Sequence, residues 1–123
     1  MEHIIESKKE TDWGLEVVLK EGVIIDNDSI LPAIKYYLDQ CQKINKNKVI
    51  VDASKIIRNV SIVKFLEVAE IIQKEPIRVK IAFIPPQLAN VSESNAMETF
   101  SYNRGVKLQY FQDMAAALEW VLQ

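Results

Sequence analysis

The chain has 123 residues, of which 49% are hydrophobic and 26% are charged. This length and balance are typical of one globular domain, residues 1–123, whose core needs neither disulfides nor metal ions. The chain carries 15 lysine and arginine residues against 17 aspartate and glutamate residues, a formal charge of −2. Because neither sign dominates and no basic run of five or more residues occurs, nucleic acid and anionic membranes are poor candidates for partners.

One cysteine, Cys41, is present, and it cannot form an internal disulfide. A lone cysteine fits a reducing compartment. The opening residues 1–6 lack the basic start and long apolar stretch of a signal peptide. No apolar run approaches the roughly 18 residues that a membrane-spanning helix needs. We therefore expect a cytoplasmic protein without a membrane span.

The first part of the chain is predicted to form two or three short strands. An apolar pair at residues 4–5 precedes a charged stretch that runs to Asp12. Residues 13–20 alternate well enough to be a strand with one covered face. Gly22 breaks this strand, and residues 23–25 form a further extended piece. We expect the first two strands to pair as a hairpin or ribbon.

Beyond this ribbon, four helices are predicted. The first begins after a cap at Asp28 or Ser29, and apolar residues at spacings of three and four form one face: Ile30, Ile34, Tyr37, Leu38, Cys41 and Ile44. The second opens at Ser61 and presents Ile62, Phe65, Leu66, Ala69 and Ile72. The third covers residues 92–104, and the fourth follows a cap at Asp113.

Three strands are predicted between these helices, at residues 48–52, 79–84 and 106–111, and the first of them is a short, continuous apolar run. Runs of this kind are typical of parallel strands that are buried on both faces. Strands that alternate with helices imply a parallel sheet. The sequence therefore predicts a single α/β domain with an N-terminal ribbon, a mostly parallel sheet of four to five strands, and four helices.

This order of elements resembles that of STAS domains, and local segments add to the likeness. Residues 49–54, Val-Ile-Val-Asp-Ala-Ser, look like the third strand and the turn after it. The tail, with Asn103-Arg-Gly105, Val106 to Asp113 and Ala116 to Leu122, is similar to the SpoIIAA-like (STAS/SEC14-type) bacterial family. The resemblance implies a phospho-switch, a transporter regulator or a ligand sensor, so it indicates a fold more sharply than a function.

In the same resemblance, Ser61 stands where anti-sigma-factor antagonists carry their phosphorylated serine. The residues around it, Arg58-Asn-Val-Ser-Ile62, lack the acid and the glycine of that motif. A hydroxyl at a helix N-terminus is a good phosphoacceptor, because the added charge meets the positive end of the helix dipole. The alternative is that Ser61 is simply an N-cap. Ser54 is a second phosphoacceptor candidate.

Polar side chains are expected near the carboxyl ends of the parallel strands, where open α/β sheets bind ligands. Asp52, Asn59, Gln87 and Asp113 form this set. No histidine, lysine or cysteine accompanies them to complete a nucleophile–base pair. They are either a ligand site or, as we favour, loop and cap hydrogen-bonding groups.

Cysteine, histidine and glycine usage gives no sign of a catalytic or cofactor site. Cys41 falls on an apolar helix face and is expected to be a buried structural thiol. His3 is the one histidine, and the three glycines are scattered. We therefore expect no metal site, no His-based triad, no phosphate-cradling loop and no cofactor.

The leading hypothesis is a non-enzymatic regulatory module that binds a protein partner, with a homodimer as one form of this. Its surface would contain Arg58, Asn59, Val60, Ser61 and Lys64, with the third helix as an extension. A second hypothesis is a domain that binds a small apolar molecule or lipid between sheet and helices. An enzyme that uses Asp52 is the third.

Overall fold

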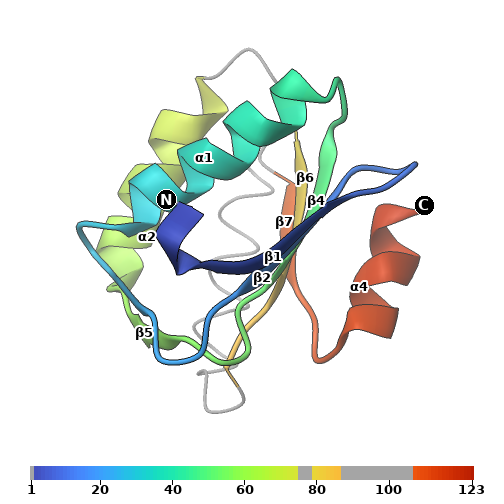
Figure 1. Cartoon of the computed structure of the whole chain (residues 1–123). Helices are drawn as coiled ribbons and strands as arrows, with labels where there is room; N and C mark the ends of the chain where they lie inside the picture. Colours follow the sequence, from blue (N-terminus) through green and yellow to red (C-terminus); the bar gives the residue numbers. More distant parts are fainter. Residues whose placement is uncertain (1, 75–78, 87–106) are drawn as a thin grey trace.

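The computed structural model describes residues 2–74, 79–86 and 107–123. Its centre is a five-stranded sheet in the order β1-β2-β4-β6-β7 (Figure 1). Strand β1 pairs antiparallel with β2, and every other neighbouring pair is parallel. The strands are β1 (Ile5–Glu10), β2 (Leu15–Leu19), β4 (Lys48–Asp52), β6 (Lys80–Ile84) and β7 (Lys107–Tyr110). The predicted ribbon and mostly parallel sheet are confirmed.

Helices cover both faces of this sheet. A single 3-10 turn, η1 (Glu2–Ile4), precedes β1. Helices α1 (Ile30–Lys43) and α2 (Ile62–Gln73) lie on one face, and α4 (Met114–Val121) lies on the other (Figure 1). The described residues thus contain three of the four predicted α-helices. The remaining one, residues 92–104, lies outside them.

The central strands explain why the sheet is covered on both faces. Val49, Ile50 and Val51 of β4 are all fully buried. Successive side chains of a strand point to opposite faces. Accordingly, Val49 and Val51 pack in the core beneath α1 and α2, whereas Ile50 packs against α4. The same alternation in β6 sends Ile81 to the larger core and Ala82 to the smaller one.

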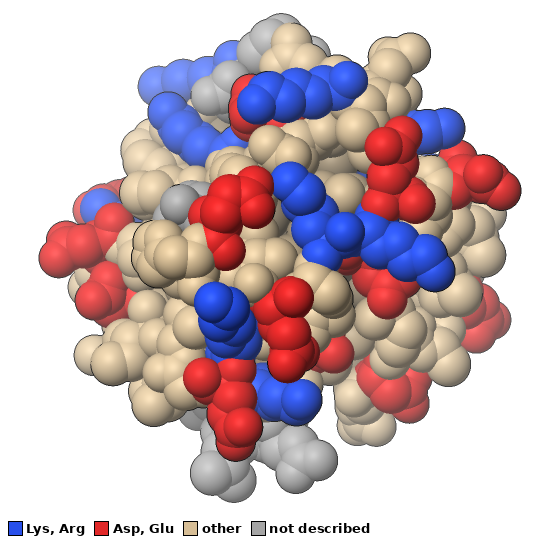
Figure 2. Space-filling view, in the orientation of Figure 1, with Lys and Arg blue, Asp and Glu red and all other residues tan. Residues whose placement is uncertain are grey.

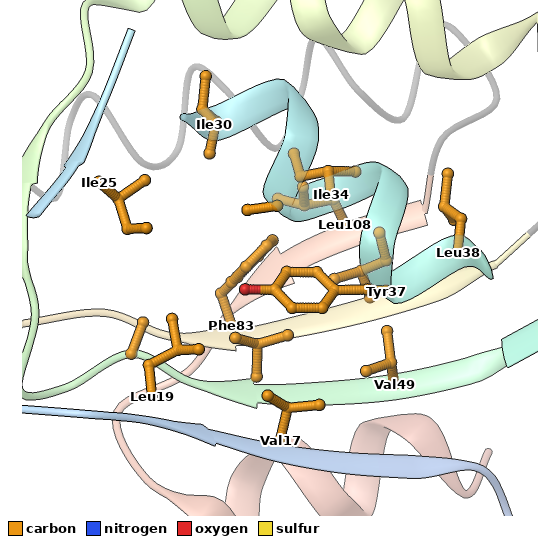
Figure 3. Close-up of a cluster of buried hydrophobic side chains, with 14 of the residues drawn as sticks. Val17, Leu19, Ile25, Ile30, Ile34, Tyr37, Leu38, Val49, Phe83 and Leu108 are labelled. Carbon is orange, nitrogen blue, oxygen red and sulfur yellow. The ribbon is translucent and has the colours of Figure 1, made fainter. Parts of the chain in front are cut away.

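The larger core is built mainly from α1 and the strands beneath it, as Figure 3 shows. All residues of the predicted apolar face of α1 are buried except Ile44, which packs partly buried at its end. Asn45, with φ at 56°, adopts the left-handed conformation that commonly ends a helix. Ser29 is the N-cap residue, but its hydroxyl bonds to Asp26 and not to the helix.

The inner face of α2 differs from the prediction. Phe65, Val68, Ala69 and Ile72 are buried, whereas Ile62 is 40% exposed. The buried stripe therefore begins one turn after the start of the helix and includes Val68, which the prediction omitted. This helix has apolar residues on more than one face, so spacing alone did not identify the buried ones.

One strand is longer than predicted, and another was not predicted at all. β1 continues through the charged stretch to Glu10, and only Ile5 of its residues is buried. A strand exposed on both faces has no alternation to detect. The loop after β4 contains β5 (Ile57–Asn59), which pairs in parallel with β3 (Ile24–Asp26) as a separate two-stranded sheet. Three residues are too few to give a periodic signal.

Candidate functional site

The carboxyl ends of the parallel strands meet α1, α2 and the β3–β5 pair around an apolar cavity of about 40 Å³. Leu19, Ala53, Phe83 and Tyr110 line it from the sheet side. The helices contribute Ile30, Ala33, Tyr37 and Phe65, and the remaining lining residues are Ile25, Ile56, Arg58, Val60, Pro85 and Pro86. The cavity thus occupies the edge of the sheet where open α/β folds bind ligands.

Ser61 is the N-cap residue of α2 and directly follows Val60, which lines the cavity. It is exposed, and its hydroxyl oxygen accepts a hydrogen bond of 3.1 Å from the backbone N–H of Lys64. Its own backbone N–H donates to Oδ1 of Asn27 over 2.9 Å. The N-cap role that serine favours is therefore confirmed. The same exposure leaves the hydroxyl accessible from solvent.

The other residues predicted for a partner surface differ in their exposure to solvent. Asn59 is exposed, and Arg58 and Lys64 are half-buried. The Lys64 ammonium lies 3.6 Å from Oε2 of Glu67. Val60 is only 8% exposed and lines the cavity. Its assignment to the surface was wrong, because the residue between β5 and Ser61 turns its apolar side chain into the core.

Asp52 and Ser54 bond to each other at the end of β4. Oδ1 of Asp52 accepts hydrogen bonds from the Ser54 hydroxyl at 2.6 Å and from the Ser54 backbone N–H at 3.1 Å. A phosphoryl group on Ser54 would meet this carboxylate as a like charge. The geometry therefore favours a structural role for both residues.

Asp113 also has a structural role, because its Oδ1 accepts a hydrogen bond from the backbone N–H of Ala116 at the start of α4. It caps this helix as predicted. Gln87 lies outside the described residues. Among the described acids of the predicted set, Asp52 and Asp113 thus serve a turn and a cap, which agrees with the interpretation favoured from the sequence.

Among the described residues, the Cys41 thiol and the acidic side chains form no reactive cluster. Burial raises the pKa of the Cys41 thiol to about 11, and its Sγ donates to the carbonyl oxygen of Lys48 at 3.8 Å. No group of three histidine, cysteine or acidic side chains among the described residues is placed to hold a metal ion.

Two features were missed at the sequence level. The first is an apolar patch, defined here as Ile24, Ile57, Ile62 and Val63, which are 58%, 55%, 40% and 68% exposed. Ile24 and Ile57 are partners in the β3–β5 pair. The excess of apolar residues around α2 was a usable signal for Ile62 and Val63. Nothing in the sequence around the short strands marked the other two as exposed.

The second missed feature is the hydroxyl of Tyr37. This residue is 2% exposed, and burial raises its pKa. The sequence placed Tyr37 correctly on the apolar face of α1, but it gave no indication that the hydroxyl would lack a partner among the described residues.

Charges of both signs are interspersed on the face shown in Figure 2, where neither sign forms an extended field. None of the helices in the described ranges has the length and apolar character needed to cross a membrane.

Comparison with known proteins identifies the fold. Neither a protein-family model nor a curated protein sequence matches the chain. A solved structure does match: an uncharacterized protein of the DUF3478 family with a SpoIIAA-like fold, from Shewanella loihica PV-4. The TM-score is 0.53 at 12% sequence identity, over 95% of this chain and 91% of that one. The chain therefore has a SpoIIAA-like fold, as its resemblance to the STAS domains implied.

Proposed function

We propose that the chain is a non-catalytic regulatory module that binds a protein partner through the apolar patch. The observation that carries this proposal is the exposure of the four aliphatic side chains of the patch. Two come from the β3–β5 pair and two from the first turn of α2, which follows β5 directly at the same end of the molecule (Figure 1). Exposed apolar groups gathered in this way commonly mark protein interaction sites.

The patch suits a reversible contact with a different protein. A standard interface buries roughly 800 Å² on each partner, and obligate homodimers bury more. Four aliphatic side chains supply only part of that area. The partner is therefore expected to present a short apolar segment, such as one face of a helix, that covers the patch and leaves polar contacts at its rim.

Ser61 is placed to regulate such a contact. It precedes Ile62 and Val63 directly, and its hydroxyl is exposed. A phosphoryl group there would add negative charge next to two apolar contact residues, and charge within an apolar interface opposes binding. Phosphorylation of Ser61 is thus proposed to release the partner.

The test is affinity capture by the immobilised full chain from extracts of its own cells, with quantitative mass spectrometry. A partner of the patch should be retained by the unmodified chain and lost with either Ile57→Lys or Val63→Lys. Leu122→Lys is the matched control, because Leu122 is as exposed as Ile57, at 55%, and belongs to the opposite face of the sheet. The proposal fails if no protein depends on the patch in this way.

The role of Ser61 is tested with two substitutions that both keep an N-cap, Ser61→Asp and Ser61→Asn. Only the first adds charge. Weaker retention of the captured partner by the aspartate variant alone is the expected result, about tenfold or more. Equal retention by both variants would show that charge at this position does not regulate binding.

A further inference from the structure

The hydroxyl of Tyr37 is a buried polar group without a partner in the described part of the chain. Tyr37 is 2% exposed and packs in the larger core, where its ring lies edge-on to that of Tyr36, but no described residue forms a hydrogen bond with its hydroxyl. Buried hydroxyls in proteins are nearly always hydrogen-bonded, so each exception needs an explanation. An absent ligand is one such explanation, provided that the group points into space.

Tyr37 lines such a space, the apolar cavity. Figure 3 shows its ring extending from α1 between the sheet residues, with the oxygen towards the end of the core where Leu19, Ile25 and Phe83 lie. All three of these residues line the cavity, as does Tyr37 itself. The hydroxyl is therefore a polar atom at the inner end of an otherwise mainly apolar cavity.

The cavity also has a route to the outside. Arg58, Pro85, Pro86 and Tyr110 line it and are only half-buried, so they mark its mouth. Tyr37 belongs to the fully buried part of the lining. A molecule that enters past the mouth would meet aliphatic and aromatic side chains along its length and a single hydroxyl at its inner end.

These features specify the class of molecule that would fit. A water molecule needs two to four polar partners, and the apolar floor offers it little beyond Tyr37. A charged group at the inner end would lose its hydration there, because Arg58, which is the one charged residue of the lining, lies at the mouth. We propose that this cavity binds a small uncharged molecule, mainly hydrocarbon, whose one hydrogen-bond-accepting oxygen receives the proton of the Tyr37 hydroxyl. This binding function is independent of the apolar patch.

The experiment compares cyclopentanone with cyclopentane, which share a ring size and differ in the acceptor oxygen. Each is titrated into the full chain while methyl resonances of Leu19, Ile25 and Ala33 are followed by NMR. Saturable shifts confined to cavity residues are expected for both probes. Tyr37→Phe removes only the hydroxyl, so it should fold normally, raise the Kd of cyclopentanone about tenfold and change that of cyclopentane less than twofold.

A second variant keeps the test independent of Tyr37. Ala33→Val adds two methyl groups inside the cavity and should weaken both probes, whereas Val63→Lys in the apolar patch should leave both titrations unchanged. The proposal is overturned if cyclopentanone gives no saturable shifts, if Tyr37→Phe affects both probes equally, or if Ala33→Val leaves both affinities as they were.

Discussion

Burial sets the chemistry of single side chains on the inner face of α1. Cys41 and Tyr37 are both almost fully buried there, and desolvation raises the pKa of each. Desolvation disfavours the charged form of a thiol or a phenol, so both groups stay neutral over the physiological range. Cys41 is thereby inert, whereas the Tyr37 hydroxyl remains a neutral hydrogen-bond donor.

The inertness of Cys41 gives a direct prediction. With a pKa of about 11, only about 0.1% of the thiol is thiolate at pH 8, and thiolate is the reactive form. Ellman's reagent at pH 8 should therefore react at least about 100-fold more slowly with the folded chain than with the chain in guanidinium chloride. Rapid modification of the folded chain would show that α1 opens readily.

The same shift has a consequence for stability. The pKa of Cys41 is higher in the folded chain than in the unfolded one. The neutral Cys41 thiol therefore makes its full contribution to the free energy of unfolding below the pKa of the exposed thiol, 9.0. This contribution is lost as the pH rises through about 11.

Gly14 and Gly22 are predicted to respond differently to replacement by alanine. A Cβ at Gly14 would lie 2.1 Å from the carbonyl oxygen of Lys48, whereas a Cβ at Gly22 would meet nothing within 4 Å. Gly14→Ala should lower the free energy of unfolding by about 3 kcal/mol, because backbone must move. Gly22→Ala should lower the free energy of unfolding by only about 1 kcal/mol, because the positive φ of Gly22 is unfavourable for alanine.

Urea unfolding of the two variants measures this difference. Gly22→Ala is the matched control, since the substitution is the same and only the space around it differs. Equal destabilisation would mean that the close approach of Gly14 to Lys48 does not constrain the hairpin.

At the scale of elements, the helices and strands with a clear pattern of apolar residues were predicted from the sequence. The α1 face followed from spacing, and the buried strands β4 and β6 followed from continuous apolar runs, since both of these strands are buried on two faces. β5 and the charged part of β1 did not, because one is three residues long and the other buries only Ile5. The candidate site was predicted in part: Ser61 was placed correctly, whereas the inward turn of Val60 depends on tertiary packing.

The packing of α4 against the sheet gives an element-scale prediction. Ala117 is fully buried beside Ile50 and Val121, whereas Ala115 of the same helix is exposed. Ala117→Leu should lower the free energy of unfolding by about 2–3 kcal/mol through overpacking. Ala115→Leu should change it by no more than about 0.5 kcal/mol.

Thermal or urea denaturation of these two variants provides the measurement. The helix propensities of both are the same, so only burial distinguishes them. A similar stability for both would show that α4 does not pack tightly on its face of the sheet.

For the whole molecule, the open edge of the sheet bears on self-association. β1 is an edge strand in which every residue after Ile5 is exposed, and its pairing with β2 is irregular between Ile5 and Ser7. Charged side chains and bulges on an edge are the means by which proteins avoid pairing edge to edge. A homodimer through the N-terminal ribbon is therefore disfavoured.

Removing this protection should make the chain associate. Ser7→Val combined with Lys9→Val gives the edge two apolar β-branched side chains and should produce dimers or larger species in light scattering. The control combines Lys35→Val with Gln42→Val, since both residues are exposed on α1. Unchanged mass for the edge variant would show that charge does not keep this strand unpaired.

The pairing of β3 with β5 also determines when the apolar patch can form. All of α1 and β4 lies between these strands in the chain, so the pairing of Ile24 with Ile57 closes a loop that contains both elements. Closing so long a loop costs conformational entropy, and two strands of three residues each form few contacts to offset it. The pair is thus expected to form late and to open first, as a local unit with rapid amide exchange. A partner that covers Ile24 and Ile57 would slow that exchange, so its presence could be detected from protection of these strands alone.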